Sequence, residues 1–212
     1  MKKIFFLLIL SGIVVNSFSQ LRYYAEAGIN QSRPAFLGGL KTGGYNYTAN
    51  TGFIGSVGII KKTKSSVQLN GKLSFLRKSY NESSWVEPDY FGTNDYKVSA
   101  FQFHFLAEKN ISQKRELQFF PSLGIYTTMH LAGTLDYELY NFGNTQKGKR
   151  DIVLNGNHSD FNRWDFGLAF GLKTQWKKYF IQFIADAGMI RPDLPAYNRW
   201  GSVQFTAGYF LK

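Results

Sequence analysis

The chain has 212 residues and no cysteine, and its 25 Lys and Arg residues against 14 Asp and Glu residues give a formal net charge of +11. The absence of cysteine excludes a disulfide framework and the lipidated cysteine of a lipoprotein. This length suits one domain after export processing, and 20 Phe, 13 Tyr and 21 Gly against 5 Pro favour β-structure over helix.

The first segment of the chain has the pattern of a secretory signal peptide. Two lysines precede the apolar stretch 4–15, and the small residues Ser17 and Ser19 follow it at the −3 and −1 positions. The apolar stretch is shorter than the roughly 20 residues of a transmembrane helix. We therefore predict a signal peptide over residues 1–19 and a mature domain over residues 20–212. Export argues against nucleic acid as a partner and makes lipid phosphates the nearer anions.

Eight stretches of the mature chain alternate between apolar and polar residues with the period of a β-strand. Each is long enough for an oblique membrane crossing, which takes about 9–11 residues. The predicted strands are residues 21–31, 52–62, 66–78, 97–109, 117–130, 161–174, 179–191 and 199–211.

The two faces of these strands differ consistently, and the difference indicates which face meets lipid. Phe101, Phe103 and Phe105, for example, alternate with Gln102 and His104. A soluble eight-stranded barrel could not hold so many large apolar side chains, because its interior has room for little more than one layer. The sequence therefore predicts an all-β fold, an eight-stranded antiparallel up-and-down transmembrane β-barrel with its apolar face in lipid and its polar face in the lumen.

The connections between the predicted strands alternate in length, at about 20, 3, 18, 7, 30, 4 and 7 residues. Outer-membrane barrels have short periplasmic turns and longer external loops. We therefore expect 79–96 and 131–160 to be external loops and both chain ends to lie on the periplasmic side. Pro121 lies inside the fifth predicted strand and cannot donate a ladder hydrogen bond, so we expect a β-bulge there.

Aromatic residues near the strand ends suggest the two interfacial girdles that are typical of membrane barrels. One girdle would contain Trp176, Tyr179 and Phe180. The other would contain Tyr80, Tyr96, Tyr126, Trp164, Tyr197 and Trp200.

The polar face carries ionisable residues that cannot face lipid, where each charge would cost a few kcal/mol. Four are basic, four are acidic and one is a histidine. Because eight strands leave room only for side chains, we expect an interior salt-bridge network and not an open pore. The predicted lumen network contains Arg22, Glu26, Lys72, His104, Glu108, Arg163, Asp165, Lys173 and Asp186.

The sequence contains no pattern that requires catalysis, a cofactor or a metal. His104, His130 and His158 form no H-x-x-x-H ligand pair. His130 and His158 lie at the two ends of the longest predicted loop, near acidic residues, so a hydrolytic site at the outer rim is the enzymatic alternative. With no nucleophile motif, a solvated loop is the better interpretation, and we expect no enzymatic activity.

A basic run in the same predicted loop suggests a contact with lipid. Lys147, Lys149 and Arg150 place three positive charges opposite the phosphates of surface lipopolysaccharide. A simple solvated stretch remains the alternative interpretation of such a run.

Three segments of the chain resemble a known family. The last strand, from Ser202 to Lys212, ends in aromatic residues and resembles the C-terminal signal that barrel-assembly machinery recognises in outer-membrane proteins. Together with the segment from Arg163 to Lys173 and the end of the signal at Phe18, it is similar to the PorT family of outer-membrane β-barrel proteins. This resemblance implies an outer-membrane barrel of a Gram-negative envelope and a part in type IX secretion. It implies no catalytic residue.

These observations favour an outer-membrane barrel with a structural or partner-docking role, associated with a type IX-like secretion apparatus. The expected partners are outer-membrane lipid, lipopolysaccharide and another envelope protein. The alternatives are a narrow channel for small solutes, a rim-sited enzyme acting on lipid or peptide, and a soluble exported binder of the lipocalin type.

Overall fold

The computed structural model describes residues 21–34, 45–63, 66–87, 90–112, 116–154, 163–189 and 200–211. The described residues form nine strands, all paired in antiparallel fashion. None of them belongs to a helix that is long and apolar enough to cross a membrane. The strands are β1 (Leu21–Pro34), β2 (Tyr45–Lys62), β3 (Val67–Glu87), β4 (Tyr90–Lys109), β5 (Leu117–Asn141), β6 (Asn144–Asp151), β7 (Trp164–Trp176), β8 (Tyr179–Gly188) and β9 (Trp200–Phe210).

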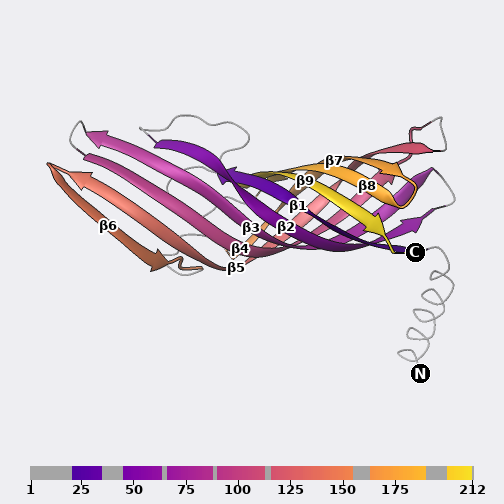
Figure 1. The fold of residues 1–212 in the computed structure, drawn as a ribbon, viewed down its shortest axis with the longest axis horizontal. Coiled ribbons are helices and arrows are strands. Elements are labelled where there is room, and N and C mark those ends of the chain that lie inside the picture. The colour runs from indigo at the N-terminus through magenta and orange to yellow at the C-terminus, as the bar shows by residue number, and fades with distance from the viewer. Residues whose placement is uncertain are drawn as a thin grey trace, which may run out of the picture.

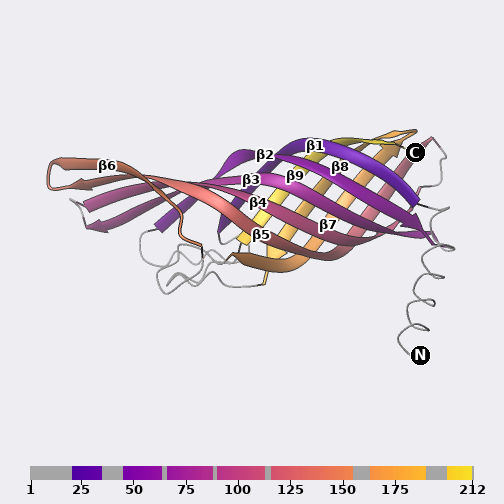
Figure 2. The same ribbon diagram turned by 90° about the horizontal axis from the view of Figure 1, so that it is seen from below.

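Eight of these strands close into a ring, which is seen obliquely in Figure 2. The order around the ring is β1-β2-β3-β4-β5-β7-β8-β9, and β9 pairs back onto β1. The remaining strand, β6, pairs with β5 outside the ring. The predicted eight-stranded antiparallel barrel is confirmed, and the structure adds a ninth strand.

Side chains of the ring alternate between the lumen and the outer surface because successive residues of a strand point to opposite faces. Phe101, Phe103 and Phe105 of β4 are between 41% and 47% exposed, whereas Gln102 and His104 are buried. The same pattern holds around the other strands. The apolar face is therefore the outer face, as the sequence predicts.

The end of the lumen nearest the short turns is filled by apolar side chains. The ring centroids of Tyr24 and Phe180 lie 5.3 Å apart in an edge-on contact. Glycines make room for both rings: a Cβ on Gly58 would lie 2.2 Å from the Tyr24 ring, and a Cβ on Gly208 would lie 2.1 Å from the Phe180 ring. We call this cluster the aromatic plug; it contains Tyr24, Ile60, Phe180 and Phe210.

The inward or outward orientation of each aromatic side chain also corrects the predicted girdles. Phe180, Tyr80, Tyr96 and Tyr126 are buried, because they share the inward-facing positions of their strands. Trp164, Trp176 and Tyr179 are exposed on the outer face, where the girdles were predicted. Tyr197 and the side chain of Trp200 lie outside the described part of the chain.

Four strands continue past the ring and are joined by β6 in a twisted sheet, which we call the blade. It contains residues 45–50 of β2, 79–87 of β3, 90–99 of β4, 132–141 of β5 and all of β6. Figures 1 and 2 show the blade projecting from the end of the barrel opposite the first residues of β1 and the last residues of β9. The prediction that 79–96 and 131–160 are external loops is wrong for most of their length, since both continue as paired strands.

Two register shifts mark the boundary between barrel and blade. Ser99 pairs with Ala132 but Ala100 pairs with His130, so Leu131 is an extra residue on β5. A second shift lies on β2 between Asn50 and Ile54. A bulge of this kind reverses which residues face inward beyond it. Leu135 is buried in the blade for this reason, against Tyr80, Tyr96, Val98 and Ile152.

The predicted bulge at Pro121 is wrong. Pro121 pairs with Leu172 of β7 without a register shift. The Ile111 amide donates to the Phe119 carbonyl, so odd-numbered residues of β5 direct their backbone groups toward β4 here. The β4–β5 ladder ends at the pair of Glu108 and Ser122, and Pro121 lies directly beyond that end. The missing N–H therefore removes no bond from the interior of the ladder.

Candidate functional site

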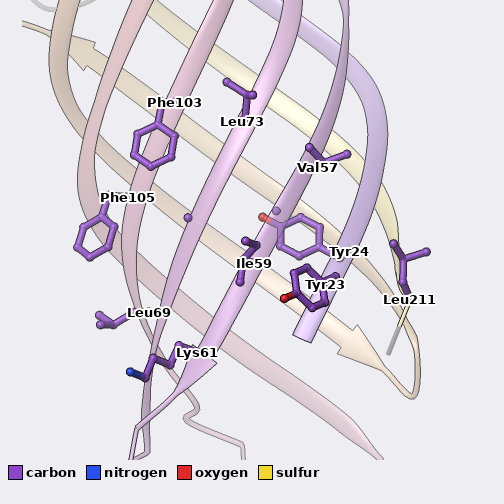
Figure 3. Close-up of a pocket in the computed structure, with 12 residues that line it drawn as sticks. Tyr23, Tyr24, Val57, Ile59, Lys61, Leu69, Leu73, Phe103, Phe105 and Leu211 are labelled. Carbon is purple, nitrogen blue, oxygen red and sulfur yellow. The ribbon is translucent and has the colours of Figure 1, made fainter. Parts of the chain in front are cut away.

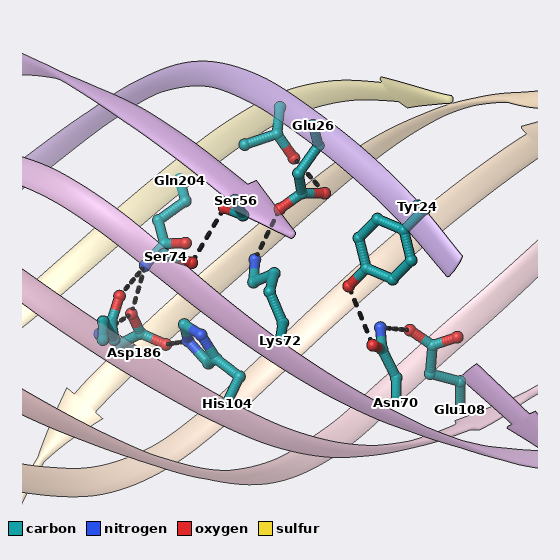
Figure 4. A network of polar contacts seen from close by, with 12 residues as sticks. Tyr24, Glu26, Ser56, Asn70, Lys72, Ser74, His104, Glu108, Asp186 and Gln204 are labelled. Carbon is teal, nitrogen blue, oxygen red and sulfur yellow. Dashed lines mark hydrogen bonds and ion pairs between the residues drawn. The ribbon is translucent and has the colours of Figure 1, made fainter. Parts of the chain in front are cut away.

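Two ion pairs lie in the lumen between strands that are far apart in sequence. The Lys72 ammonium of β3 lies 3.0 Å from a carboxylate oxygen of Glu26 of β1, and both side chains are fully buried (Figure 4). Lys173 of β7 pairs with Glu108 of β4, again inside the barrel. Each charge has its counter-ion within the ring, which offsets the cost of removing it from water.

Neighbouring side chains complete the hydrogen bonding of Glu108. The Gln68 amide donates to one carboxylate oxygen at 2.6 Å and the Asn70 amide donates to the other at 2.7 Å. The Tyr24 hydroxyl donates to the Asn70 oxygen at 2.9 Å, which joins this network to the aromatic plug (Figure 4). Lys173 also lies over the Phe120 ring, 5.1 Å from its centroid. Its charge is therefore enclosed by protein.

A second centre forms around Asp186 of β8. His104 lies with its Nε2 at 2.9 Å from one carboxylate oxygen. The other oxygen accepts hydrogen bonds from Ser202 at 2.7 Å, Gln204 at 2.8 Å and Gln102 at 3.1 Å. Four side chains from two strands of the ring, β4 and β9, converge on this single carboxylate, and its acceptor capacity is used by the barrel itself.

A third centre lies nearer the blade. The Tyr126 hydroxyl donates to Asp165 at 3.0 Å, and both residues are buried. Lys78 is buried at the same end of the lumen with 2% of its surface exposed, and it is not among the predicted lumen residues. The signal was present, because Lys78 continues the inward-facing even positions 68, 70, 72, 74 and 76 of β3.

The structure brings seven of the nine predicted lumen residues into the buried interior: Glu26, Lys72, His104, Glu108, Asp165, Lys173 and Asp186. Arg22 lies at the turn end, where its guanidinium carbon is 3.9 Å from the centroid of the Phe210 ring. Arg163 is exposed, just before β7, and stands outside these buried centres.

The described part of the chain holds no metal site, and only one of the two histidines of the hydrolytic alternative lies in it. No group of three His, Asp or Glu side chains lies close enough within the described ranges to hold a metal ion. His130 is buried at the barrel–blade boundary, where its amide donates to the Arg163 carbonyl at 2.8 Å. His158 lies outside the described residues.

The free end of the blade is a tight hairpin with an unusual residue in it. Asn141 pairs with Asn144, so Phe142 and Gly143 are the two turn residues. Both have positive φ, 45° and 84°, as a type I′ turn requires. A large non-glycine residue rarely adopts this conformation. The Phe142 side chain is 72% exposed, and Tyr140 beside it is also exposed.

Charged residues cross-link the blade strands. Lys97 of β4 lies 2.7 Å from Asp95 and 2.9 Å from Asp136 of β5. These hydrogen bonds raise the pKa of Lys97, and the bond from Lys97 lowers the pKa of Asp136. The predicted basic run falls on β6: Lys147 lies 2.9 Å from Glu138, Lys149 lies 3.9 Å from Asp136, and Arg150 is exposed.

A family model described as an outer membrane protein β-barrel domain matches residues 15–189. The chain belongs to this family. It is an outer-membrane β-barrel protein, and the match agrees with our expectation of a non-enzymatic barrel. The alternative of a soluble exported lipocalin-like binder is thereby set aside. Among curated proteins, none matches the chain.

Solved structures similar to this outer-membrane barrel share little sequence with it. Neisserial surface protein A is 10% identical with a TM-score of 0.43, over 90% of this chain and 96% of that one. OprG of Pseudomonas aeruginosa is 10% identical with a TM-score of 0.41, over 90% and 95%. Ail, the attachment invasion locus protein of Yersinia pestis, is 12% identical with a TM-score of 0.39, over 91% and 99%.

Proposed function

We propose that this outer-membrane barrel is a docking protein, in which the ring anchors the chain and the blade presents a partner-binding surface. An export signal over residues 1–19 belongs to the proposal, and a mature protein that does not begin at Gln20 would contradict it.

The strands that form the blade are far longer than a membrane crossing requires. From Met129, aligned with Trp164 at the rim, β5 and its turn continue for about 40 Å of strand length at about 3.3 Å per residue.

The filled lumen supports docking over the alternative of a narrow solute channel. The ion pairs of Lys72 and Lys173 and the centre at Asp186 occupy the middle of the barrel, and the aromatic plug occupies its turn end. A solute would have to displace buried, paired charges, which is costly. The blade, by contrast, extends beyond the ring.

The observation that carries the proposal is Phe142. The two-residue turn that it occupies is best served by Asn-Gly, because Asn tolerates positive φ and Phe does not. Holding a bulky residue in this conformation costs on the order of 1–3 kcal/mol. Phe142 is also exposed, so packing within the blade does not repay that cost. A strained, exposed aromatic residue at the tip of a rigid projection fits an anchor for a partner's pocket.

We further propose that the partner belongs to a type IX-like secretion apparatus. This step is supported by the resemblance of residues 163–173 and 202–212 to the PorT family, and by the outward projection of the blade. Lipopolysaccharide is the proposed contact of Lys147, Lys149 and Arg150. The side chains of the two lysines keep 68% and 66% of their surface exposed while they pair with carboxylates of β5.

Site-specific photo-cross-linking in intact cells tests the docking role. A photoreactive phenylalanine analogue at Tyr140 reports contacts of the tip, and the same analogue at Phe166 on the lipid-facing surface is the control. We expect a discrete protein adduct at Tyr140 that is absent at Phe166. Phe142→Asn should remove this adduct while the temperature at which the folded barrel loses its heat-modifiable migration stays equal or rises, because strain of about 1 kcal/mol or more is relieved.

The same experiment separates the parts of the proposal. An undiminished adduct in Phe142→Asn would contradict the anchor role. An adduct whose mass-spectrometric identity lies outside any secretion apparatus would leave docking in place and overturn the secretion assignment. Neutralising Lys147, Lys149 and Arg150 to Gln should lower the lipopolysaccharide that co-purifies with the barrel, and unchanged co-purification would exclude that contact.

A further inference from the structure

The outer surface of the barrel has an apolar groove on the β2–β4 side. Its volume is about 610 Å³, within the range of about 300–1,000 Å³ that is typical of ligand sites. Figure 3 shows Val57 and Ile59 on one side, Leu69 and Leu73 along β3, and Phe103 and Phe105 on the other side.

The groove exists because Gly71 stands at an outward-facing position of β3. Its register partners are Ile59 of β2 and Phe105 of β4. The nearest atom to a Cβ placed on Gly71 would be the tip of the Phe103 ring, at 3.9 Å, so the missing side chain leaves open space between two apolar walls. A floor without a side chain and walls of branched and aromatic residues give an apolar trough.

One end of the groove is basic. Lys61 lines it, one outward position beyond Ile59 toward the turn end of β2. Lys109 occupies an outward position at the same end of β4, with only β3 between the two strands. Among described residues near this end, Lys62, Lys177 and Lys178 are also exposed, and Glu116 is the exposed acid. An elongated apolar groove with cations at one end complements a molecule with a hydrocarbon chain and an anionic head.

We infer that this groove binds a phospholipid with an anionic headgroup. One acyl chain lies over Gly71 between the β2 and β4 walls, and the phosphate lies against Lys61 and Lys109. The short turns place this end of the barrel toward the periplasm, so the lipid comes from the phospholipid leaflet. The site is separate from the blade and is independent of the docking role.

Native mass spectrometry of the purified barrel in detergent tests the inference. Phosphatidylglycerol and phosphatidylcholine with the same acyl chains are added in parallel, and the bound fraction is followed as collision energy rises. We expect phosphatidylglycerol to be retained severalfold better than phosphatidylcholine. Gly71→Leu fills the trough, and Lys61→Gln with Lys109→Gln removes the headgroup contact, so both variants should lose that retention.

Matched controls are available in the same sheet. Gly55 of β2 also faces outward, and a Cβ placed there meets no atom within 4 Å, but the residue lies outside the groove. Gly55→Leu should therefore keep the lipid. Lys177→Gln with Lys178→Gln removes the same charge from the same end and should also keep it. Heat-modifiable migration of each variant verifies that the barrel is folded.

Several results would overturn the inference. Equal retention of the two lipids would exclude the headgroup contact. Equal loss of retention in Gly71→Leu and Gly55→Leu would exclude the groove as the binding site. Displacement of phosphatidylglycerol by equimolar lipopolysaccharide would assign the site to another lipid. A dimer that Gly71→Leu dissociates would assign the groove to a second copy of the chain.

Discussion

At the scale of single residues, the buried ion pairs are the most consequential feature of the lumen. Glu26 accepts from Thr206 at 3.1 Å and has the Lys72 ammonium at 3.0 Å. A charge that loses its partner in this environment cannot reach water. Removing one member of such a pair is therefore far more damaging than replacing both.

Lys72→Met should destabilise the barrel by about 3–5 kcal/mol, because it leaves the Glu26 carboxylate buried without its cation. The double variant Glu26→Gln with Lys72→Met should recover most of that loss, since no charge remains to be compensated. Urea unfolding in detergent micelles, followed by the heat-modifiable band, measures the difference. A single variant as stable as the double would show that the pair contributes nothing.

The inward positions were largely predictable from sequence because a strand's alternation is a local property. Glu26, Lys72 and Asp186 follow from the parity of their neighbours alone. Which partners they have was not predictable, since pairing depends on register around a closed ring. Lys78 is not in the predicted network because the predicted strand ends at this residue, although its position in the alternation matches that of Lys72.

At the scale of elements, an ion pair between Lys97 of β4 and Asp136 of β5 joins two strands of the blade. The pKa of Asp136 is lowered by its hydrogen bond from Lys97, so its contribution to stability is present above its ordinary pKa of about 4 and lost as pH falls through the lowered value. The pKa of Lys97 is raised, chiefly by Asp95 and then by Asp136. Its contribution is present below about pH 10 and lost as pH rises through the raised value.

We therefore expect the blade to be equally ordered between about pH 5 and 9 and to loosen as the pH falls through the lowered pKa of Asp136. A nitroxide spin label at Gln146 on β6 reports this as a rise in mobility at acid pH. Asp136→Asn should show the raised mobility already at neutral pH, whereas Glu116→Gln, at the opposite end of the molecule, should behave as the wild type. Mobility that does not depend on pH in the wild type would exclude the ion pairs as the support of the blade.

The paired strands of the blade could not be predicted from the sequence, for a physical reason. The extra residue Leu131 shifts the alternation, so the apolar positions of β5 change from one face to the other between Met129 and Leu135. A pattern with a fixed period of two ends at that point, so the residues beyond it are predicted as a loop. The turn at Phe142 and Gly143, flanked by Asn141 and Asn144, was the available local sign of a hairpin.

At the scale of the whole molecule, the ring, the filled lumen and the blade define a protein that is anchored in the membrane without opening it. In a planar bilayer the wild-type protein should give no stable large conductance steps, while a porin inserted under the same conditions should. Sustained steps from the purified barrel would contradict the closed lumen and favour the channel alternative.

The aromatic plug also bears on how the ring is completed. Tyr24 belongs to the first strand of the ring and Phe210 to the last, and these two strands pair with each other. The rings of Tyr24, Phe180 and Phe210 can therefore meet only when the two ends of the barrel sequence come together. The plug therefore spans the junction of β1 and β9, and its packing is completed in the same step that closes the ring.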